Sequence, residues 1–120
     1  ENLAMTLAFE WGHAGVRVNT VSPGWIASSG MDTFEGEFKR NIPLLKNHVP
    51  LGRIGTESEV SSVVCFLLSE GAAFITGINV GIDGGVPLGT RNIPLPEGGR
   101  SQPYEGFHLA VTPKVLLEGS

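Results

Sequence analysis

The sequence is poor in cysteine, in basic residues and in long apolar runs, and each shortage removes a class of function. Its 120 residues include a single cysteine, so no disulfide can form within the chain. Eight Lys and Arg residues against 12 Asp and Glu give a net charge of −4. The basic residues are scattered, which argues against a nucleic-acid or anionic-membrane partner. No apolar run approaches the roughly 20 residues that cross a bilayer.

Much of a dinucleotide-binding fold is also missing. No strand leads into a glycine-rich turn and a helix that could hold a pyrophosphate, and only two stretches have the pattern of strands. The apolar series Leu3, Leu7 and Trp11 predicts a helix from the first residues, without a clear cap before it. We therefore expect the sequence to be the C-terminal portion of a longer protein. Cys65 lies in an apolar run and is expected to be a small buried side chain rather than a nucleophile.

Charged and ligand-forming side chains give no sign of catalysis or metal binding. The histidines show no metal-ligand spacing, so no metal is assigned to His13, His48 or His108. Surface or ion-paired roles are expected for Asp32, Glu35 and Arg53. Asp83-Gly84-Gly85 follows a strand and fits a structural turn. No catalytic residue is assigned in this chain.

Residues 16–26 are the stretch around which the rest is organised. β-Branched residues alternate with others from Val16 to Val21, which predicts a strand. Pro23 and Gly24 then end it, because proline lacks a ladder donor and glycine adopts backbone angles closed to other residues. Open α/β sheets bind ligands just beyond the carboxyl ends of their strands, so a cofactor is expected at this turn. A purely structural turn is the alternative.

A helix and a second strand follow farther along. Thr56 and Glu59 have the spacing of a capping box, and the helix they begin is apolar nearly all round between residues 60 and 68. Such a helix is expected to be buried against both a sheet and a neighbouring subunit. Alternation at Ile78, Val80 and Ile82 predicts the second strand. The fold class is therefore α/β, as the C-terminal part of a Rossmann-like doubly wound parallel sheet with about two strands.

Three blocks in this order resemble the short-chain dehydrogenase/reductase family. They are Arg17-Val18-Asn19-Thr20-Val21-Ser22-Pro23-Gly24-Trp25-Ile26, Pro50-Leu51-Gly52-Arg53-Ile54-Gly55, and Phe74-Ile75-Thr76-Gly77 leading into Asp83-Gly84-Gly85. Residues 59–69 are similar to trans-2-enoyl-CoA reductases and their citronellol-type dehydrogenase relatives. The resemblance implies a family domain half at 1–85 and an extended tail at 86–120. A tail segment with Phe107, Leu109, Val111 and Val115 could dock on a partner subunit.

The resemblance also implies a cofactor, NAD or NADP, and the residues that meet it. The family turn that approaches the nicotinamide corresponds to Pro23, Gly24, Trp25 and Ile26, with a hydroxyl from Ser28 where the family more often has threonine. A substrate segment at about residues 28–50 would fold over an acyl-CoA or an aliphatic alcohol or carbonyl compound. Its apolar residues recur at helical spacing, so one or two short helices are expected. The substrate residues are Met31, Phe34 and Phe38, with Ile42 and Leu45 in the same pocket.

Several interpretations stay open from the sequence. The chain is interpreted as part of an NAD(P)-dependent oxidoreductase most like an enoyl-CoA reductase, of a dehydrogenase acting on a terpenoid or other aliphatic alcohol, or of a non-catalytic oligomerisation or binding module. By the resemblance, the catalytic Tyr and Lys would precede Glu1, so this chain alone is expected to be inactive. The whole protein is expected to be a cytoplasmic homo-oligomer, a dimer or tetramer. Residues 31–47 would otherwise be an ordinary surface helix pair.

Overall fold

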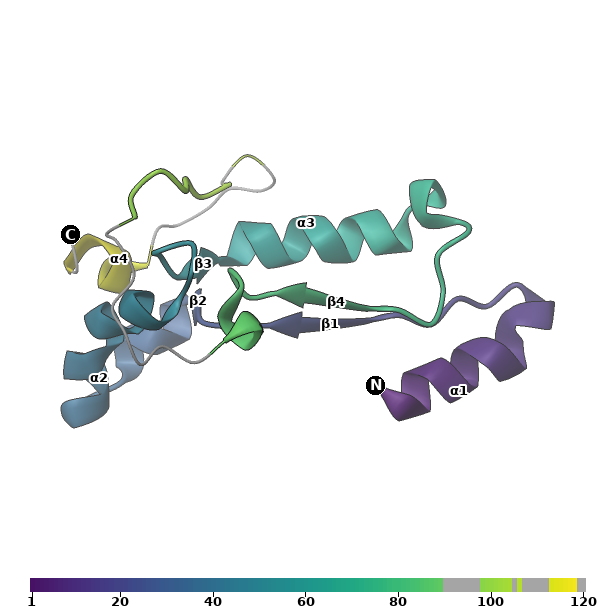
Figure 1. Ribbon diagram of the computed structural model, residues 1–120, viewed down its shortest axis with the longest axis horizontal. Helices are drawn as coiled ribbons and strands as arrows, with labels where there is room; N and C mark the ends of the chain where they lie inside the picture. The colour runs from purple at the N-terminus through teal and green to yellow at the C-terminus, as the bar shows by residue number, and fades with distance from the viewer. Residues whose placement is uncertain (90–97, 105, 107–112, 119–120) are drawn as a thin grey trace.

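A computed structural model describes residues 1–89, 98–104, 106 and 113–118 (Figure 1). The elements in these residues, with η for 3-10 helices, are α1 (Asn2–Trp11), η1 (Gly12–Ala14), β1 (Thr20–Pro23), β2 (Ile26–Ala27), η2 (Ser29–Thr33), α2 (Glu37–Asn41), η3 (Ile42–His48), β3 (Gly55–Thr56), α3 (Glu57–Leu68), η4 (Glu70–Ala72), β4 (Asn79–Ile82), η5 (Val86–Leu88) and α4 (Lys114–Glu118). Helices α2 and η3 confirm the short helices expected in the substrate segment.

The described strands form two parallel pairs. Strand β1 pairs with β4 in the register Thr20↔Asn79, and the two-residue strands β2 and β3 pair in the register Ile26↔Gly55. The connection from β1 to β4 includes α3, which runs alongside that pair in Figure 1. Parallel strands joined through a helix confirm the predicted α/β fold. The short β2–β3 pair is an addition that the sequence did not predict.

Strand β1 begins later than predicted, at Thr20 instead of Val16. The two segments still meet before Thr20, since the Gly77 N–H donates to the Val18 carbonyl oxygen at 2.8 Å, but the Val18 N–H donates to the Thr76 hydroxyl at 3.1 Å, so a side chain replaces a backbone acceptor of the ladder. An arginine side chain also holds the residues before β1. The Arg17 guanidinium donates to the Leu67 carbonyl oxygen at 2.8 Å, at the C-terminal end of α3. A cation at that position is favoured by the helix dipole.

Helix α3 confirms the predicted capping box but not the predicted burial. The Thr56 hydroxyl accepts from the Glu59 N–H at 3.3 Å, and the Glu59 carboxylate accepts from the Thr56 N–H at 3.0 Å. Phe66 and Leu68, near the C-terminal end of the helix, are exposed. The expectation of a buried Cys65 is wrong, because it lies on this same uncovered part of α3 and is exposed.

The best-buried cluster lies under the substrate segment. Its buried members are Ala27, Ile42, Ile54 and Val115, and Met31, Leu45 and Leu116 pack against them. Val115 belongs to α4, which Figure 1 places beside the substrate segment at the end of the molecule opposite α1. An extended backbone is therefore the wrong expectation for residues 114–118, and Val115 packs on its own chain. Phe107, Leu109 and Val111 lie outside the described residues, and the boundary after residue 85 stays a prediction.

Helix α1 lies where the sequence predicts a helix, yet most of its large apolar side chains are exposed. Ala8 is buried, whereas Leu3, Phe9 and Trp11 are exposed. Gly12 does not stop the helix outright, since its backbone continues into η1, and the chain turns only at Gly15 with a φ of 77°. In the described part of the chain, no helix combines the length and apolar character needed to span a membrane.

Candidate functional site

The predicted cofactor turn lies at the carboxyl end of β1, where Gly24 is held close to β4. The Gly24 N–H donates to the Ile82 carbonyl oxygen at 2.9 Å. A Cβ atom on Gly24 would lie 2.9 Å from both the Cα and the Cβ of Asp83. Gly24 has no left-handed φ, so the sequence-based reason given for this glycine is wrong. The turn requires glycine because there is no space for a side chain.

The second family block lies directly against this turn. The Gly55 N–H donates to the Trp25 carbonyl oxygen at 2.8 Å, which starts the β2–β3 pairing. A Cβ atom on Gly55 would lie 2.7 Å from the Cδ1 atom of Ile26. Because that atom is the end of a flexible side chain, it can move, and the packing at Gly55 is less strict than the backbone contact at Gly24.

In the third block, Asp83, Gly84 and Gly85 form the structural turn that the sequence predicted, and this turn borders the same region. Gly84 and Gly85 have left-handed φ values of 63° and 92°, and the Asp83 Oδ1 accepts from the Gly85 N–H at 3.0 Å. The Gly84 carbonyl oxygen accepts from the Leu51 N–H at 3.2 Å, which joins this turn to the second block. The Pro23-Gly24 turn, the second block and the Asp83-Gly84-Gly85 part of the third block thus meet beyond the carboxyl ends of β1 and β4.

Two hollows flank the predicted cofactor turn. The first has a volume of about 470 Å³ and is lined by Trp25, Ile26, Val49, Pro50, Leu51, Arg53, Gly55, Glu59, Gly81, Ile82, Asp83, Gly84, Gly85 and Leu88. The second, of about 450 Å³, is lined by Pro23, Ile26, Glu57, Val60 and Ser61. Ile26 lies between the two and contributes to both. Three of the five predicted cofactor residues, Pro23, Trp25 and Ile26, therefore line a hollow, whereas Gly24 lines neither.

Ser28 follows β2 as the residue before η2 and is half-buried. In the part of the chain that the structure describes, its hydroxyl makes no hydrogen bond to another protein group. It contributes to neither hollow. A half-buried hydroxyl with its bonding capacity unused is available to a ligand, which is the role that the sequence analysis gave it.

The predicted substrate residues separate into two groups. Met31 packs inward on the cluster that contains Ile42, which is 1% exposed. Phe34 and Phe38 face outward and contact each other edge to face, with ring centroids 5.1 Å apart and an interplanar angle of 85°. Neither group lines the two hollows. Ile42 is buried and Leu45 half-buried in that cluster, and Ile42 also lines a separate hollow of about 240 Å³ together with Ile54 and Val115. Their place in a substrate pocket stays a prediction.

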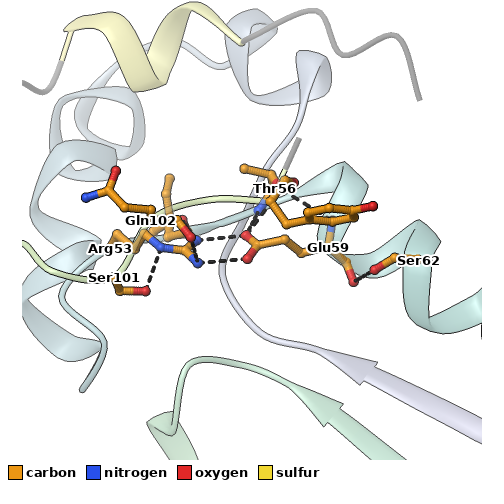
Figure 2. A network of polar contacts seen from close by, with 8 residues as sticks. Arg53, Thr56, Glu59, Ser62, Ser101 and Gln102 are labelled. Carbon is orange, nitrogen blue, oxygen red and sulfur yellow. Dashed lines mark hydrogen bonds and ion pairs between the residues drawn. The ribbon is translucent and has the colours of Figure 1, made fainter. Parts of the chain in front are cut away.

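A polar network at the N-terminus of α3 borders the first hollow (Figure 2). The Arg53 guanidinium forms a bidentate pair with the Glu59 carboxylate, both N–O distances being 2.7 Å. Its other donors reach the Ser101 hydroxyl at 2.9 Å and the carbonyl oxygens of Ile54 and Gln102. All five N–H groups of Arg53 are thus used within the protein, and none is left for a phosphate or carboxylate ligand.

The ionisation of Glu59 is set by this network. The pKa of the Glu59 carboxyl is lowered from its ordinary value of 4.5, chiefly by the hydrogen bonds from Arg53, with a smaller contribution from the Thr56 N–H and hydroxyl and against the effect of partial burial. Because the carboxylate is both ionised and paired, Glu59 is poorly suited to act as a general acid. The ion pair agrees with the surface or ion-paired role expected for Arg53.

Sequence reasoning missed what Asp32 does. Its two carboxylate oxygens accept from the backbone N–H groups of Lys114 and Val115, at 3.3 and 3.2 Å. A separation of 82 residues gives no periodic signal for such a pairing. Across residues 1–89, 98–104, 106 and 113–118, no three histidine, cysteine or acidic side chains gather in a way that could hold a metal ion.

The parallel strands and the space-limited glycine turn at their carboxyl ends define the class as an open α/β protein. Proteins of this class bind ligands at that edge of the sheet. Residues 1–87 match the family model described as enoyl-(acyl carrier protein) reductase. The chain therefore belongs to the short-chain dehydrogenase/reductase family. It spans about a third of the length of the curated relatives that it matches.

Three relatives illustrate the similarity. The chain is 40% identical over 85 residues to a probable 2,4-dienoyl-CoA reductase of Bacillus subtilis strain 168, covering 70% of this chain and 34% of the relative. The structure of a citronellol catabolism dehydrogenase of Pseudomonas aeruginosa PAO1 matches with 53% identity and a TM-score of 0.55, over 71% of this chain and 30% of that one. A 4-hydroxyisoleucine dehydrogenase mutant, complexed with NADH and succinate, matches with 30% identity and a TM-score of 0.65, over 75% and 37%.

Proposed function

We propose that this chain is the C-terminal part of an NAD(P)-dependent oxidoreductase that reduces the double bond of enoyl thioesters such as acyl-CoA compounds. The observation that carries the proposal is the Gly24 turn, packed too tightly for a side chain and opening on hollows at the carboxyl edge of the parallel strands. The enoyl-thioester assignment draws on the family model and on the dienoyl-CoA reductase relative.

The described residues fit one end of a nicotinamide cofactor. Trp25 and Ile26 offer apolar surface to a ring beside the turn, and the unused Ser28 hydroxyl can hydrogen-bond to a carboxamide. When bound, the cofactor supplies or accepts the hydride. No described glycine-rich turn faces a helix N-terminus to hold the pyrophosphate, and Arg53 has no donor to spare for it. NAD and NADP remain equal candidates.

A second candidate is a dehydrogenase of a terpenoid or other aliphatic alcohol. It is favoured by the 53% identity to the citronellol catabolism dehydrogenase, the highest among the three relatives above. Both candidates require a largely apolar substrate, so they share the same cofactor turn and the same substrate segment. A non-catalytic oligomerisation or binding module is the third and weakest interpretation, since it leaves the Gly24 turn and the Ser28 hydroxyl without a role.

The exposed apolar side chains of this chain indicate how the longer protein assembles. We propose that the longer protein is a homo-oligomer, a dimer or tetramer, in which the exposed side chains Phe66 and Leu68 of α3 are covered. The proposed compartment is the cytoplasm, in keeping with a single unpaired cysteine.

The isolated 120-residue chain is expected to show no turnover of enoyl thioesters or aliphatic alcohols with either cofactor. The positioned proton donor and the pyrophosphate loop are both expected outside it, so hydride transfer has neither its acid nor its full cofactor site. The check is a spectrophotometric assay of nicotinamide oxidation and reduction, combined with calorimetric titration of NADH and NADPH. Turnover, or micromolar cofactor affinity, in the purified chain would disprove the expectation that the proton donor and the pyrophosphate loop lie outside it.

Chain-length preference is expected to depend on the aromatic pair of the substrate segment. In the longer protein, Phe34→Ala or Phe38→Ala should lower kcat/KM about tenfold for long acyl or isoprenoid chains while short chains change less than about twofold. The reason is that a closing segment would bring these exposed rings onto the distal methylenes. Leu44→Ala is the matched control, since Leu44 is equally exposed on η3. An equal loss at every chain length would mean that the pair is ordinary surface structure.

A further inference from the structure

Residues after the family match attach to the substrate segment (residues 28–50) from outside. The matched region ends at residue 87, whereas α4 and the stretch 98–104 lie beyond it. Helix α4 packs against η2 and η3 of the substrate segment, as Figure 1 shows. The family model does not include this tail, whereas the proposed function assigns the segment it contacts to the substrate. These contacts therefore point to a role that is specific to this protein.

The first attachment is polar and centred on Asp32 of η2. Both oxygens of its carboxylate accept backbone N–H groups at the start of α4, from Lys114 and Val115. Hydrogen bonds to an ionised acceptor are about twice as strong as neutral ones. One side chain of the substrate segment thereby fixes the position of α4, and α4 in turn limits the movement of η2.

The second attachment is apolar and uses Val115. Its side chain is 7% exposed and belongs to the cluster with Ala27, Ile42 and Ile54. Ala27 lies on β2, one residue after Ile26 of the predicted cofactor turn, and Ile42 lies on η3. Val115 therefore contacts a cluster shared by the cofactor turn and the substrate segment.

The stretch 98–104 is anchored to the N-terminus of α3. The Ser101 hydroxyl and the Gln102 carbonyl oxygen accept from Arg53, and the Tyr104 carbonyl oxygen accepts from the Thr56 hydroxyl at 3.2 Å (Figure 2). This stretch and α4 both belong to the tail that follows the family match. The tail thus holds both α3 and the substrate segment.

We propose that residues 98–104 and 113–118 act as a clamp that pre-orders the substrate segment, with Asp32 and Val115 as positioning residues for substrate binding. The proposal rests on the function proposed above. A segment that is already ordered does not lose conformational entropy when substrate binds, so the clamp lowers KM. None of the described residues of the clamp lines either of the two hollows at the cofactor turn, so kcat and cofactor affinity are expected to change less than KM.

The test compares Asp32→Ala, Asp32→Asn and the control Lys114→Ala in the full-length protein that contains this chain. Lys114→Ala keeps the backbone N–H that Asp32 accepts and removes only an exposed side chain. For Asp32→Ala we expect amide hydrogen exchange in residues 29–48 to rise about tenfold and KM for the longest enoyl thioester to rise about fivefold, with kcat and cofactor affinity within about twofold. Asp32→Asn, which retains a carbonyl acceptor, should recover most of the affinity.

The exchange and kinetic measurements test the clamp and the proposed function separately. If the wild-type protein turns over neither enoyl thioesters nor aliphatic alcohols, the proposed function falls, and the exchange rates of Asp32→Ala against Lys114→Ala still decide on the clamp. Equal exchange in those two variants overturns the clamp, and so does a parallel loss of kcat and cofactor affinity. If Asp32→Ala does not fold, Val115→Ala, which only trims the apolar attachment, is measured against the same control with the same criteria.

Discussion

Substitution of Gly24 by valine is expected to reduce kcat/KM about a hundredfold for every substrate of the longer protein, whatever its chain length. Even a Cβ atom would lie 2.9 Å from the Asp83 backbone, so the valine must push β1 and the turn away from β4. Displacing the turn moves Trp25 and Ile26 relative to the cofactor, which makes the loss independent of substrate. Steady-state kinetics across a chain-length series, with NADH and NADPH titrations, measures it.

Gly12→Ala is the matched control for that experiment. Gly12 follows α1 in a helical conformation, with a φ of −57°, and a methyl group added there would meet no other part of the chain within 4 Å. Its substitution should leave activity unchanged and stabilise the protein slightly, by about 0.5 kcal/mol. If Gly24→Val keeps activity near that of Gly12→Ala, the turn at Gly24 does not position the cofactor.

Replacing Arg53 by alanine is expected to lower the free energy of unfolding by about 2 kcal/mol, because the Glu59 carboxylate and the carbonyl oxygens of Ile54 and Gln102 lose their donor. Arg53→Lys should fall in between, since an ammonium keeps the charge but not the fork of donors. Arg40→Ala, in α2, is the control, because its exposed side chain takes no part in this network. Urea unfolding of the three variants gives the comparison, and equal values for Arg53→Ala and Arg40→Ala would contradict it.

The same pair predicts a pH dependence of stability. The pKa of Glu59 is lowered in the folded protein, so its contribution is fully present above the unfolded value of about 4.5 and is lost as the pH falls below 4.5 through the folded pKa. The stability advantage of wild type over Glu59→Gln should therefore shrink in that acidic range and stay constant from about pH 5 to about pH 7. A constant difference across the acidic range as well would show that the pair does not set the pKa.

The local signals in the sequence were sufficient for the parallel fold and for α3. A capping box at Thr56 and Glu59 depends only on residues three apart, and alternation at Val80 and Ile82 depends only on the strand itself. Both patterns therefore predicted elements that the structure contains. Pro23 and Gly24 likewise predicted the turn at the carboxyl end of the strand.

Features that depend on distant residues could not be predicted in this way. The start of β1 depends on the Thr76 hydroxyl, which replaces a backbone acceptor for the Val18 N–H, and the space at Gly24 depends on Asp83. The role of Asp32 depends on residues 82 positions away in a tail without periodicity. Exposure of Cys65 was mispredicted because an apolar run shows that a face needs a partner but does not show that the partner lies in the same chain.

The most direct test of the central claim is transfer of deuterium from the nicotinamide ring. Full-length protein containing this chain would be incubated with a 2-enoyl thioester and with NADH or NADPH that carries two deuterium atoms at C4, so that either face of the ring delivers deuterium. The product would be examined by mass spectrometry and NMR. We predict that one deuterium reaches the β-carbon as hydride while a solvent proton reaches the α-carbon, with loss of the double bond and formation of NAD⁺ or NADP⁺. The same experiment would be run with an aliphatic aldehyde in place of the thioester. If neither the thioester product nor the alcohol contains deuterium with either cofactor, the assignment of this chain to a nicotinamide-dependent oxidoreductase is contradicted.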